Sequence, residues 1–319
     1  METKKIIFIS KSLYGTPLHS DTLFGHICWA VRYKKGESVL KEMLNKFNSG
    51  NPPFLISSAF PENYIFRPLI PMSEIVYDKN KPKTAKEKKN MESLKKNKKL
   101  EYVLISDIIK FQKDYKSNNI FTDISDEALS DIKIQEYPVT RNMINRNTLT
   151  VEEGHLWTDS YYFCNSEKPL NAYLKVMDDK YNDDFFKEVF EYLSQVGIGK
   201  DKSVGKGKFD ISLHNLNEDE NKLLNYRGTH FVSLSHCAGS NLTPLSYNVF
   251  IKYGKVSEDF SSKGLYYKKP IAFYKHGAVF KFDNTINIYG TMVKGIHTNN
   301  DIVQYGYSFP LFIDYKETI

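Results

Sequence analysis

A helix, a glycine-rich loop and a strand follow one another directly, and this succession constrains the fold more than any other part of the chain. Residues 182–197 (NDDFFKEVFEYLSQVG) have the apolar spacing of an amphipathic helix, with Asn182 as its N-cap and Gly197 as its stop. The strand KFDISL begins at Lys208. The side chains predicted to face inward are Phe185, Phe186, Val189, Phe190 and Leu193.

The N-terminal region predicts a strand, a turn and another helix. Residues 5–10 (KIIFIS) form a β-branched run, and Gly15 begins a Gly-Thr-Pro turn. The helix is capped by Ser20 or Asp21 and stops at Gly36. One face of this helix must lie on a sheet, because its apolar residues recur at helical spacing. They are Leu23, Phe24, Ile27, Cys28 and Val31.

The next part of the chain alternates clear elements with one ambiguous region. A second helix is predicted from Glu37 to about Phe47, and PPFLISSAF (52–60) reads as a strand. Residues 72–140 lack a consistent period and are taken as an insertion. A turn at Glu152 to Gly154 then predicts a hairpin, and NAYLKVM (171–177) predicts a further strand.

These elements predict an α+β protein of two packed domains. The order of strands and helices in residues 1–214 is typical of a ferredoxin-like fold, with the insertion at about 72–140 and the glycine-rich loop at 197–207. Residues 226–319 carry mostly strand signals, which predicts a second, β-rich ferredoxin-like domain. The boundary is expected near the acidic stretch 217–220.

The positive charge of the chain is concentrated in one segment. Residues 79–99 contain ten lysines against Glu87 and Glu92, a local charge of +8, whereas the whole chain carries +6. A segment with so few apolar residues cannot build a core. It is either a solvated loop or a segment that contacts phosphates, and its composition does not decide between the two.

Several classes of protein are disfavoured. The three cysteines, Cys28, Cys164 and Cys237, lack the spacing of a disulfide framework or a zinc module, so we expect reduced thiols and no metal site. Aspartates at 178–184 suit helix starts. The apolar runs are too short to span a membrane, and we expect a cytoplasmic protein without a cofactor.

The glycine-rich loop suits an anion but matches no nucleotide-binding motif. No frame between Gly197 and Gly207 supplies a Walker sequence or a dinucleotide fingerprint. Glycines at positive φ allow close backbone approach, and successive N–H groups can then bind phosphate oxygens. The alternative is a solvated hairpin tip. The candidate RNA-binding residues of the loop are Gly197, Gly199, Lys200, Lys202, Ser203, Gly205, Lys206, Gly207 and Lys208.

The loop GIGKDKSVGKGKF resembles that of the RAMP superfamily of CRISPR-associated RNA-binding proteins. PLHSDTLFGHICWAV resembles the opening helix motif of one branch, the fourth subunit of the type III-A Csm effector complex. Three further stretches agree in order: RNTLTVEEGHLWTDSYYF, KKPIAFYKHGAVF and QYGYSFPLFI. Together these stretches sample most of the chain outside the lysine-rich segment.

The resemblance implies a non-catalytic subunit that binds and caps the 5′ repeat-derived tag of crRNA in antiviral defence. Its partners would be the large Palm-containing subunit, a RAMP backbone subunit and, through the complex, target RNA. Self/non-self discrimination would belong to the same assembly. Besides the loop, the resemblance transfers RNA contacts to His19, Ser20, Arg141 and Arg146.

Two other classes of function stay open from the residues alone. A metal-free endoribonuclease that processes crRNA would use His19 as general acid or base, and His26, two turns further along the helix, is a weaker candidate. A protein-only scaffold would use exposed aromatic side chains. The tyrosines to inspect for exposure are Tyr266, Tyr267, Tyr305 and Tyr307.

Overall fold

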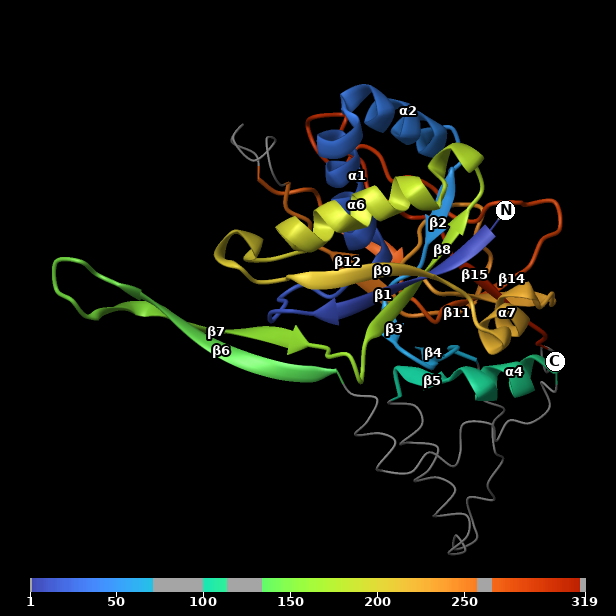
Figure 1. The fold of residues 1–319 in the computed structure, drawn as a ribbon, viewed down its shortest axis with the longest axis horizontal. Helices are drawn as coiled ribbons and strands as arrows, with labels where there is room; N and C mark the ends of the chain where they lie inside the picture. The colour runs from blue at the N-terminus through green and yellow to red at the C-terminus, as the bar shows by residue number, and fades with distance from the viewer. Residues whose placement is uncertain (1, 71–99, 114–133, 257–265, 316–319) are drawn as a thin grey trace, which may run out of the picture.

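The computed structural model describes residues 2–70, 100–113, 134–256 and 266–315, so the lysine-rich run at 79–99 lies outside the described residues. Within the described part, the fold combines antiparallel sheets with helices and is an α+β structure (Figure 1). The first sheet has the strand order β2-β8-β1-β9, with β3 also paired to β8. These strands are β1 (Glu2–Ser10), β2 (Phe54–Ile56), β3 (Phe60–Pro61), β8 (Leu170–Val176) and β9 (Phe209–Asn215).

Three helices lie together on one side of the first sheet: α1 (Ser20–Lys35), α2 (Glu37–Asn48) and α6 (Asp183–Val196) (Figure 1). The predicted inward face of α6 is confirmed, because all five of its apolar residues are buried. Its N-cap is also confirmed, since the Asn182 side chain accepts a hydrogen bond from the Phe185 N–H at 3.0 Å.

The predicted N-cap of α1 is wrong. His19 occupies the N-cap position without a side-chain cap, and Ser20 is the first helical residue. The Ser20 N–H instead donates to Ser58 Oγ at 3.0 Å. Ser20 and Asp21 are both buried because this first turn packs against the C-terminal half of the protein rather than facing solvent.

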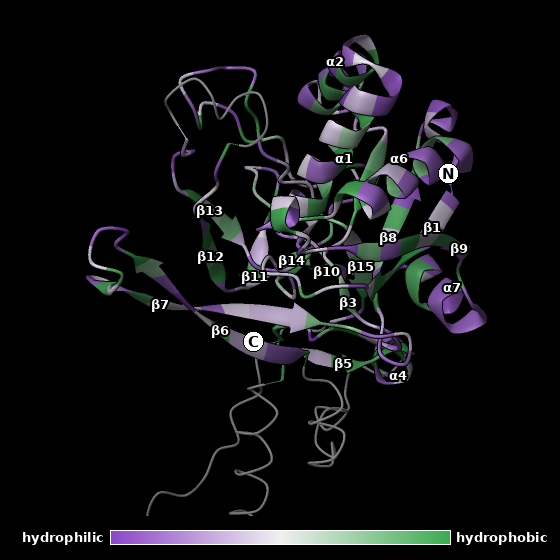
Figure 2. Cartoon of the chain, turned by 60° about the vertical axis from the view of Figure 1, so that its left-hand side comes forward, coloured by the Kyte–Doolittle hydropathy of each residue, from purple (hydrophilic) through white to green (hydrophobic). Residues whose placement is uncertain are grey.

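The predicted hairpin exists, but its turn lies elsewhere. β6 (Gln135–Ile144) pairs with β7 (Val151–Phe163), and the turn spans 145–150 rather than Glu152 to Gly154. The Asn145 Oδ1 atom accepts the Asn147 N–H at 2.9 Å, a local bond that favours turning there. The hairpin projects from the body and carries hydrophobic segments near its tip (Figures 1 and 2).

The described residues between β3 and β7 belong to the fold. β4 (Tyr64–Phe66) pairs with β5 (Tyr102–Leu104), and α4 (Ile105–Lys113) follows. The amide of Gln112 donates to the carbonyls of Leu223 and Phe312 at 3.0 and 2.8 Å. Residues 100–113, predicted to be part of an insertion, therefore pack against the rest of the described fold, and β6 extends from it as one strand of the hairpin.

The C-terminal part forms a second antiparallel sheet of strand order β11-β14-β10-β15. The helix α7 (Glu218–Asn225), with a capping box between Asn217 and Glu220, precedes it. The two-stranded β12–β13 sheet lies beside it. Bounds are β10 (His230–Ser233), β11 (Pro244–Ser246), β12 (Val249–Lys252), β13 (Ile271–Tyr274), β14 (Val279–Lys281) and β15 (Pro310–Ile313).

One hydrophobic core joins the two parts. Tyr305 and Tyr307, two of the tyrosines to inspect for exposure, are buried in it and are not available to a partner. The Tyr305 hydroxyl accepts the Ile56 N–H at 3.1 Å, and Tyr307 donates to the Phe47 carbonyl at 2.5 Å. None of the helices in the described ranges has the length and apolarity needed to cross a membrane.

Replacement of Tyr305 by Phe tests this connection. Removing the hydroxyl leaves the buried Ile56 N–H without its acceptor, so the free energy of unfolding should fall by about 1–3 kcal/mol. Chemical denaturation measures the loss. Tyr253→Phe, at an exposed side chain, is the matched control, and equal stability of the two variants would contradict the assigned role of Tyr305.

Candidate nucleic-acid interface

All four glycines of the loop between α6 and β9 have positive φ: 85° at Gly197, 86° at Gly199, 83° at Gly205 and 68° at Gly207. The predicted need for backbone freedom is therefore confirmed. A Cβ at Gly207 would lie 2.1 Å from the carbonyl oxygen of Ile198, which is itself buried. The base of the loop is therefore part of the packed interior.

The backbone of the loop is largely used within the protein. The Gly199 N–H donates to His26 Nε2, the Lys200 N–H to Thr16 Oγ1, and the Gly207 N–H to the Leu13 carbonyl, all at 2.8–2.9 Å. The N–H groups of Ile198, residues 204–206 and Lys208 also donate internally. The predicted phosphate cradle of successive N–H groups is therefore not formed by these amides.

The outer end of the loop is a single 3₁₀ turn, η2 (Lys202–Val204). Ser203, Val204 and Gly205 are exposed there, and the Val204 side chain is 71% exposed. Asp201 caps the turn in the left-handed region at φ 61°. The loop thus presents a compact, exposed tip on a buried base, instead of a uniformly solvated segment.

A network of charged side chains connects the loop to the hairpin. Arg141 on β6 donates a hydrogen bond from Nη2 to Asp201 Oδ2 at 2.5 Å. Its Nε atom lies 3.3 Å from Asp159 Oδ2 on β7. Lys200 Nζ lies 2.6 Å from Asp159 Oδ1. Tyr161 is at the centre, because its hydroxyl donates to Asp201 and accepts from Arg141. The network holds the loop against the base of the hairpin.

The network leaves a small excess of positive charge. Arg141, Lys200 and Lys206 place their cationic groups 5.5–5.9 Å from the centre of the Tyr161 ring, against the two carboxylates of the network. The Lys200 ammonium holds the pKa of Asp159 below its ordinary value, so this carboxylate stays ionised. Lys208 Nζ donates to the Gln195 carbonyl.

Sequence patterns identified only part of this interface. Arg141 was predicted, and the structure brings it to the glycine loop. Arg146 is exposed in the hairpin turn, near its tip. Asp159, Tyr161 and Asp201 were missed; the alternation of polar and aromatic residues in TDSYY and the single acid among the loop lysines were the available signals.

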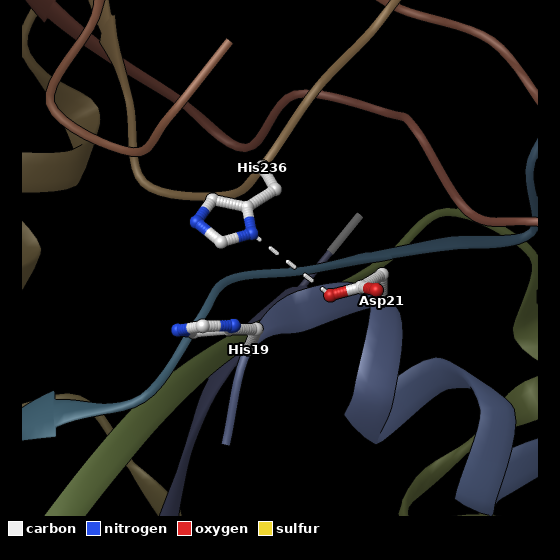
Figure 3. Close-up of side chains that lie close together, drawn as sticks. All are labelled: His19, Asp21 and His236. Carbon is white, nitrogen blue, oxygen red and sulfur yellow. Dashed lines mark ion pairs between the residues drawn. The ribbon is translucent and has the colours of Figure 1, made fainter. Parts of the chain in front are cut away.

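His19 and Ser20 belong to a different environment. The ring of His19 lies 4.3 Å from that of His236 and 5.4 Å from that of Phe250, centroid to centroid. Ser20 is fully buried, and its Oγ accepts the His236 N–H at 3.2 Å. The predicted RNA contact by Ser20 therefore disagrees with its burial. Figure 3 shows His19 close to Asp21 and His236.

His26 supports the loop from α1. Burial, together with a smaller effect of nearby Lys202, lowers the pKa of His26 to about 4. The imidazole is therefore neutral near pH 7, which leaves Nε2 able to accept the Gly199 N–H. The weaker candidate for catalysis is thus a structural acceptor that positions the loop.

Comparisons with known proteins agree on the fold. No family model matches the chain, and no curated protein matches it by sequence. Among solved structures, the chain has the fold of the Csm fourth subunit, Csm4. A chain of the Csm1-Csm4 cassette in complex with cA4 aligns with TM-score 0.64 and 16% identity, over 99% of this chain and 100% of that one.

Two further structures give the same result. The Csm1-Csm4 cassette in complex with pppApA aligns with TM-score 0.64 and 17% identity, with coverage of 99% and 100%. The Csm3-Csm4 subcomplex of the type III-A CRISPR-Cas interference complex aligns with TM-score 0.61 and 16% identity, with coverage of 97% and 98%. The sequence resemblance to the fourth subunit is therefore confirmed at the level of the fold.

Two glycine variants test the packing of the loop. Gly205→Ala meets no atom within 4 Å but keeps a positive φ, so stability should fall by about 1–2 kcal/mol. Gly207→Ala adds a backbone clash and should cost about 2–5 kcal/mol. Thermal and denaturant unfolding measure the stability of the two variants. Equal losses of stability would show that the backbone at the base of the loop can shift to accommodate a Cβ at Gly207.

The pH dependence of stability tests His26. The pKa of His26 is about 4 in the folded protein, compared with an ordinary value of 6.5. Between pH 4 and pH 6.5, His26 is therefore protonated in the unfolded chain but not in the folded protein. Stability should fall as the pH drops from about 6.5 to about 4, with a contribution on the order of 3 kcal/mol from His26. His26→Gln, which retains an acceptor, should flatten this acid limb in denaturation curves.

His214→Gln is the control for the same measurement, because His214 is exposed on β9. An acid limb that is unchanged by His26→Gln would refute the assignment, and one that is flattened equally by both variants would place its origin elsewhere.

Proposed function

We propose that this chain is a non-catalytic RNA-binding subunit of a type III-A CRISPR (Csm) interference complex. It binds and caps the 5′ repeat-derived tag of crRNA and connects a large Palm-containing subunit to a RAMP backbone subunit. The observation that carries the proposal is the alignment over nearly the whole chain with Csm4 folds from both Csm1-Csm4 and Csm3-Csm4 assemblies. Such a subunit works in the cytoplasm, supports target RNA recognition and contributes to self/non-self discrimination.

The proposal includes a ferredoxin-like architecture for both halves. For the first half, the support is the antiparallel order β2-β8-β1-β9, with α1 between β1 and β2 and α6 between β8 and β9. This order places the glycine loop where the last helix leads into the last strand. The loop therefore lies at the end of the sheet next to the β6–β7 hairpin.

The hairpin and the loop tip supply the RNA-binding surface in this proposal. The loop presents Lys202, Ser203 and Lys206, and the hairpin presents Arg146 together with apolar side chains that stack on or pack against bases. Leu156 is 65% exposed and Trp157 is 45% exposed. Cations beside exposed apolar and aromatic groups are typical of single-stranded RNA recognition.

The nuclease alternative is less well supported. Burial lowers the pKa of His19 to about 3, with a further contribution from His276. An imidazole that binds protons so weakly is a poor general base at neutral pH. His26, the second candidate, already accepts the Gly199 N–H. We therefore propose that the chain binds crRNA without cleaving it.

A matched pair of double variants tests RNA binding by the loop. Lys202→Ala with Lys206→Ala should weaken binding to tag RNA, and the slope of log affinity against log salt should flatten by up to about 1.4, or roughly 0.7 per lost phosphate contact. Lys41→Ala with Lys222→Ala removes the same charge from exposed positions on α2 and α7 and should bind as wild type.

If both double variants weaken binding to tag RNA equally, the loss reflects net charge alone, and this result would contradict an RNA-binding site at the loop. RNA recovered from the same mixtures should be intact, and cleavage that depends on His19 would restore the nuclease alternative. Co-purification from the native host and sequencing of the bound RNA test the wider proposal. The expected result is a uniform 5′ end from a CRISPR repeat.

A further inference from the structure

His19, Asp21 and His236 form a cluster between the first turn of α1 and the segment after β10 (Figure 3). One ligand atom from each residue lies within 4.8 Å of the other two. His236 Nδ1 is 4.0 Å from Asp21 Oδ1. This cluster lies apart from the loop–hairpin network and has no role in the function proposed above.

Three polar atoms of this cluster are deeply buried and have no hydrogen-bond partner among the described residues. In the described part of the chain these atoms are Asp21 Oδ1 and both ring nitrogens of His236, and the side chains of both residues are fully buried. A buried polar atom without a partner costs about 1–3 kcal/mol. Three such atoms in one cluster indicate that a ligand is to be accommodated there.

The surrounding residues fix the orientation of the carboxylate and of one ring. Asp21 Oδ2 accepts hydrogen bonds from Lys252 Nζ at 2.8 Å and Gln304 Nε2 at 2.7 Å, which leaves Oδ1 directed toward His236. The His276 ring stacks on His236 at 4.9 Å with an angle of 10° between the planes. Hydrogen bonds to the second oxygen of a ligating carboxylate, as on Asp21 Oδ2, are typical of metal centres.

We propose that His19, Asp21 and His236 bind one divalent transition metal ion of the Zn²⁺ class. Two imidazoles and one carboxylate suit Zn²⁺ and its neighbours, and a water molecule would complete the coordination. Two ligands at about 2.0–2.1 Å from a tetrahedral metal lie about 3.4 Å apart. The cluster is therefore within a small side-chain movement of that geometry.

The ion would join α1 to the C-terminal half, because its ligands come from both. Lys252 stays on Oδ2, so the carboxylate serves the lysine and the metal through different oxygens.

Metal titration of the whole protein tests the proposal. The purified chain is stripped with a chelator, dialysed and titrated with Zn²⁺ in competition with a chromophoric chelator, and with Co²⁺ by visible absorption. One metal per chain should bind. His19→Gln and His236→Gln should each weaken binding by more than about 100-fold, since loss of even an outer partner costs 10–100-fold. His230→Gln, at another buried histidine, should bind as wild type.

X-ray absorption of the zinc-loaded wild type keeps the test independent of the folding of the variants. Imidazole and oxygen scattering without sulfur is expected. Sulfur scattering would place the metal on a cysteine and overturn the proposal. Failure to bind either metal, or binding that is unaffected by both ligand variants, would also overturn it, while RNA binding by the loop variants would remain a separate result.

Discussion

The buried carboxylate of Asp21 is the interaction on which the arrangement of the two halves depends. It lies in the first turn of α1 and accepts hydrogen bonds from Lys252 and Gln304, both in the C-terminal half. Loss of one partner from such a buried pair typically costs 3–5 kcal/mol, because the other charge is left without compensation. The pair therefore fixes where α1 begins relative to the second sheet.

The same helix determines the position of the glycine loop. His26 lies less than two turns beyond Asp21 and accepts the Gly199 N–H, while Thr16, just before the helix, accepts the Lys200 N–H. A displacement of α1 would therefore move the loop, and through Asp201 and Arg141 it would also affect the base of the hairpin. The candidate RNA surface and the contact between the two halves are therefore connected through α1.

Local sequence patterns predicted the elements whose determinants are local. The inward face of α6, the Asn182 cap and the positive φ of the loop glycines depend on neighbours a few residues away. The predicted position of the hairpin turn was wrong because a glycine such as Gly154 favours a turn prediction. In the structure the turn lies at Asn145, whose side chain accepts a backbone hydrogen bond within the turn. The contacts of Arg141 with Asp201, and of His19 with His236, join distant positions and have no periodic signature.

The internal hydrogen bonds of the loop change how its composition should be understood. Glycines and lysines together suggest a backbone cradle for phosphate, yet most of the amides in the loop donate to the protein, and a Cβ at Gly207 meets a carbonyl at 2.1 Å. The glycines therefore shape the loop, and the lysine side chains supply its charge. The ammonium group of Lys200 forms an ion pair with the Asp159 carboxylate, and this ion pair restrains the lysine side chain. Phosphate contacts by the loop consequently depend on the side chains at its tip. These side chains are positioned by a backbone whose N–H groups mostly donate hydrogen bonds within the protein.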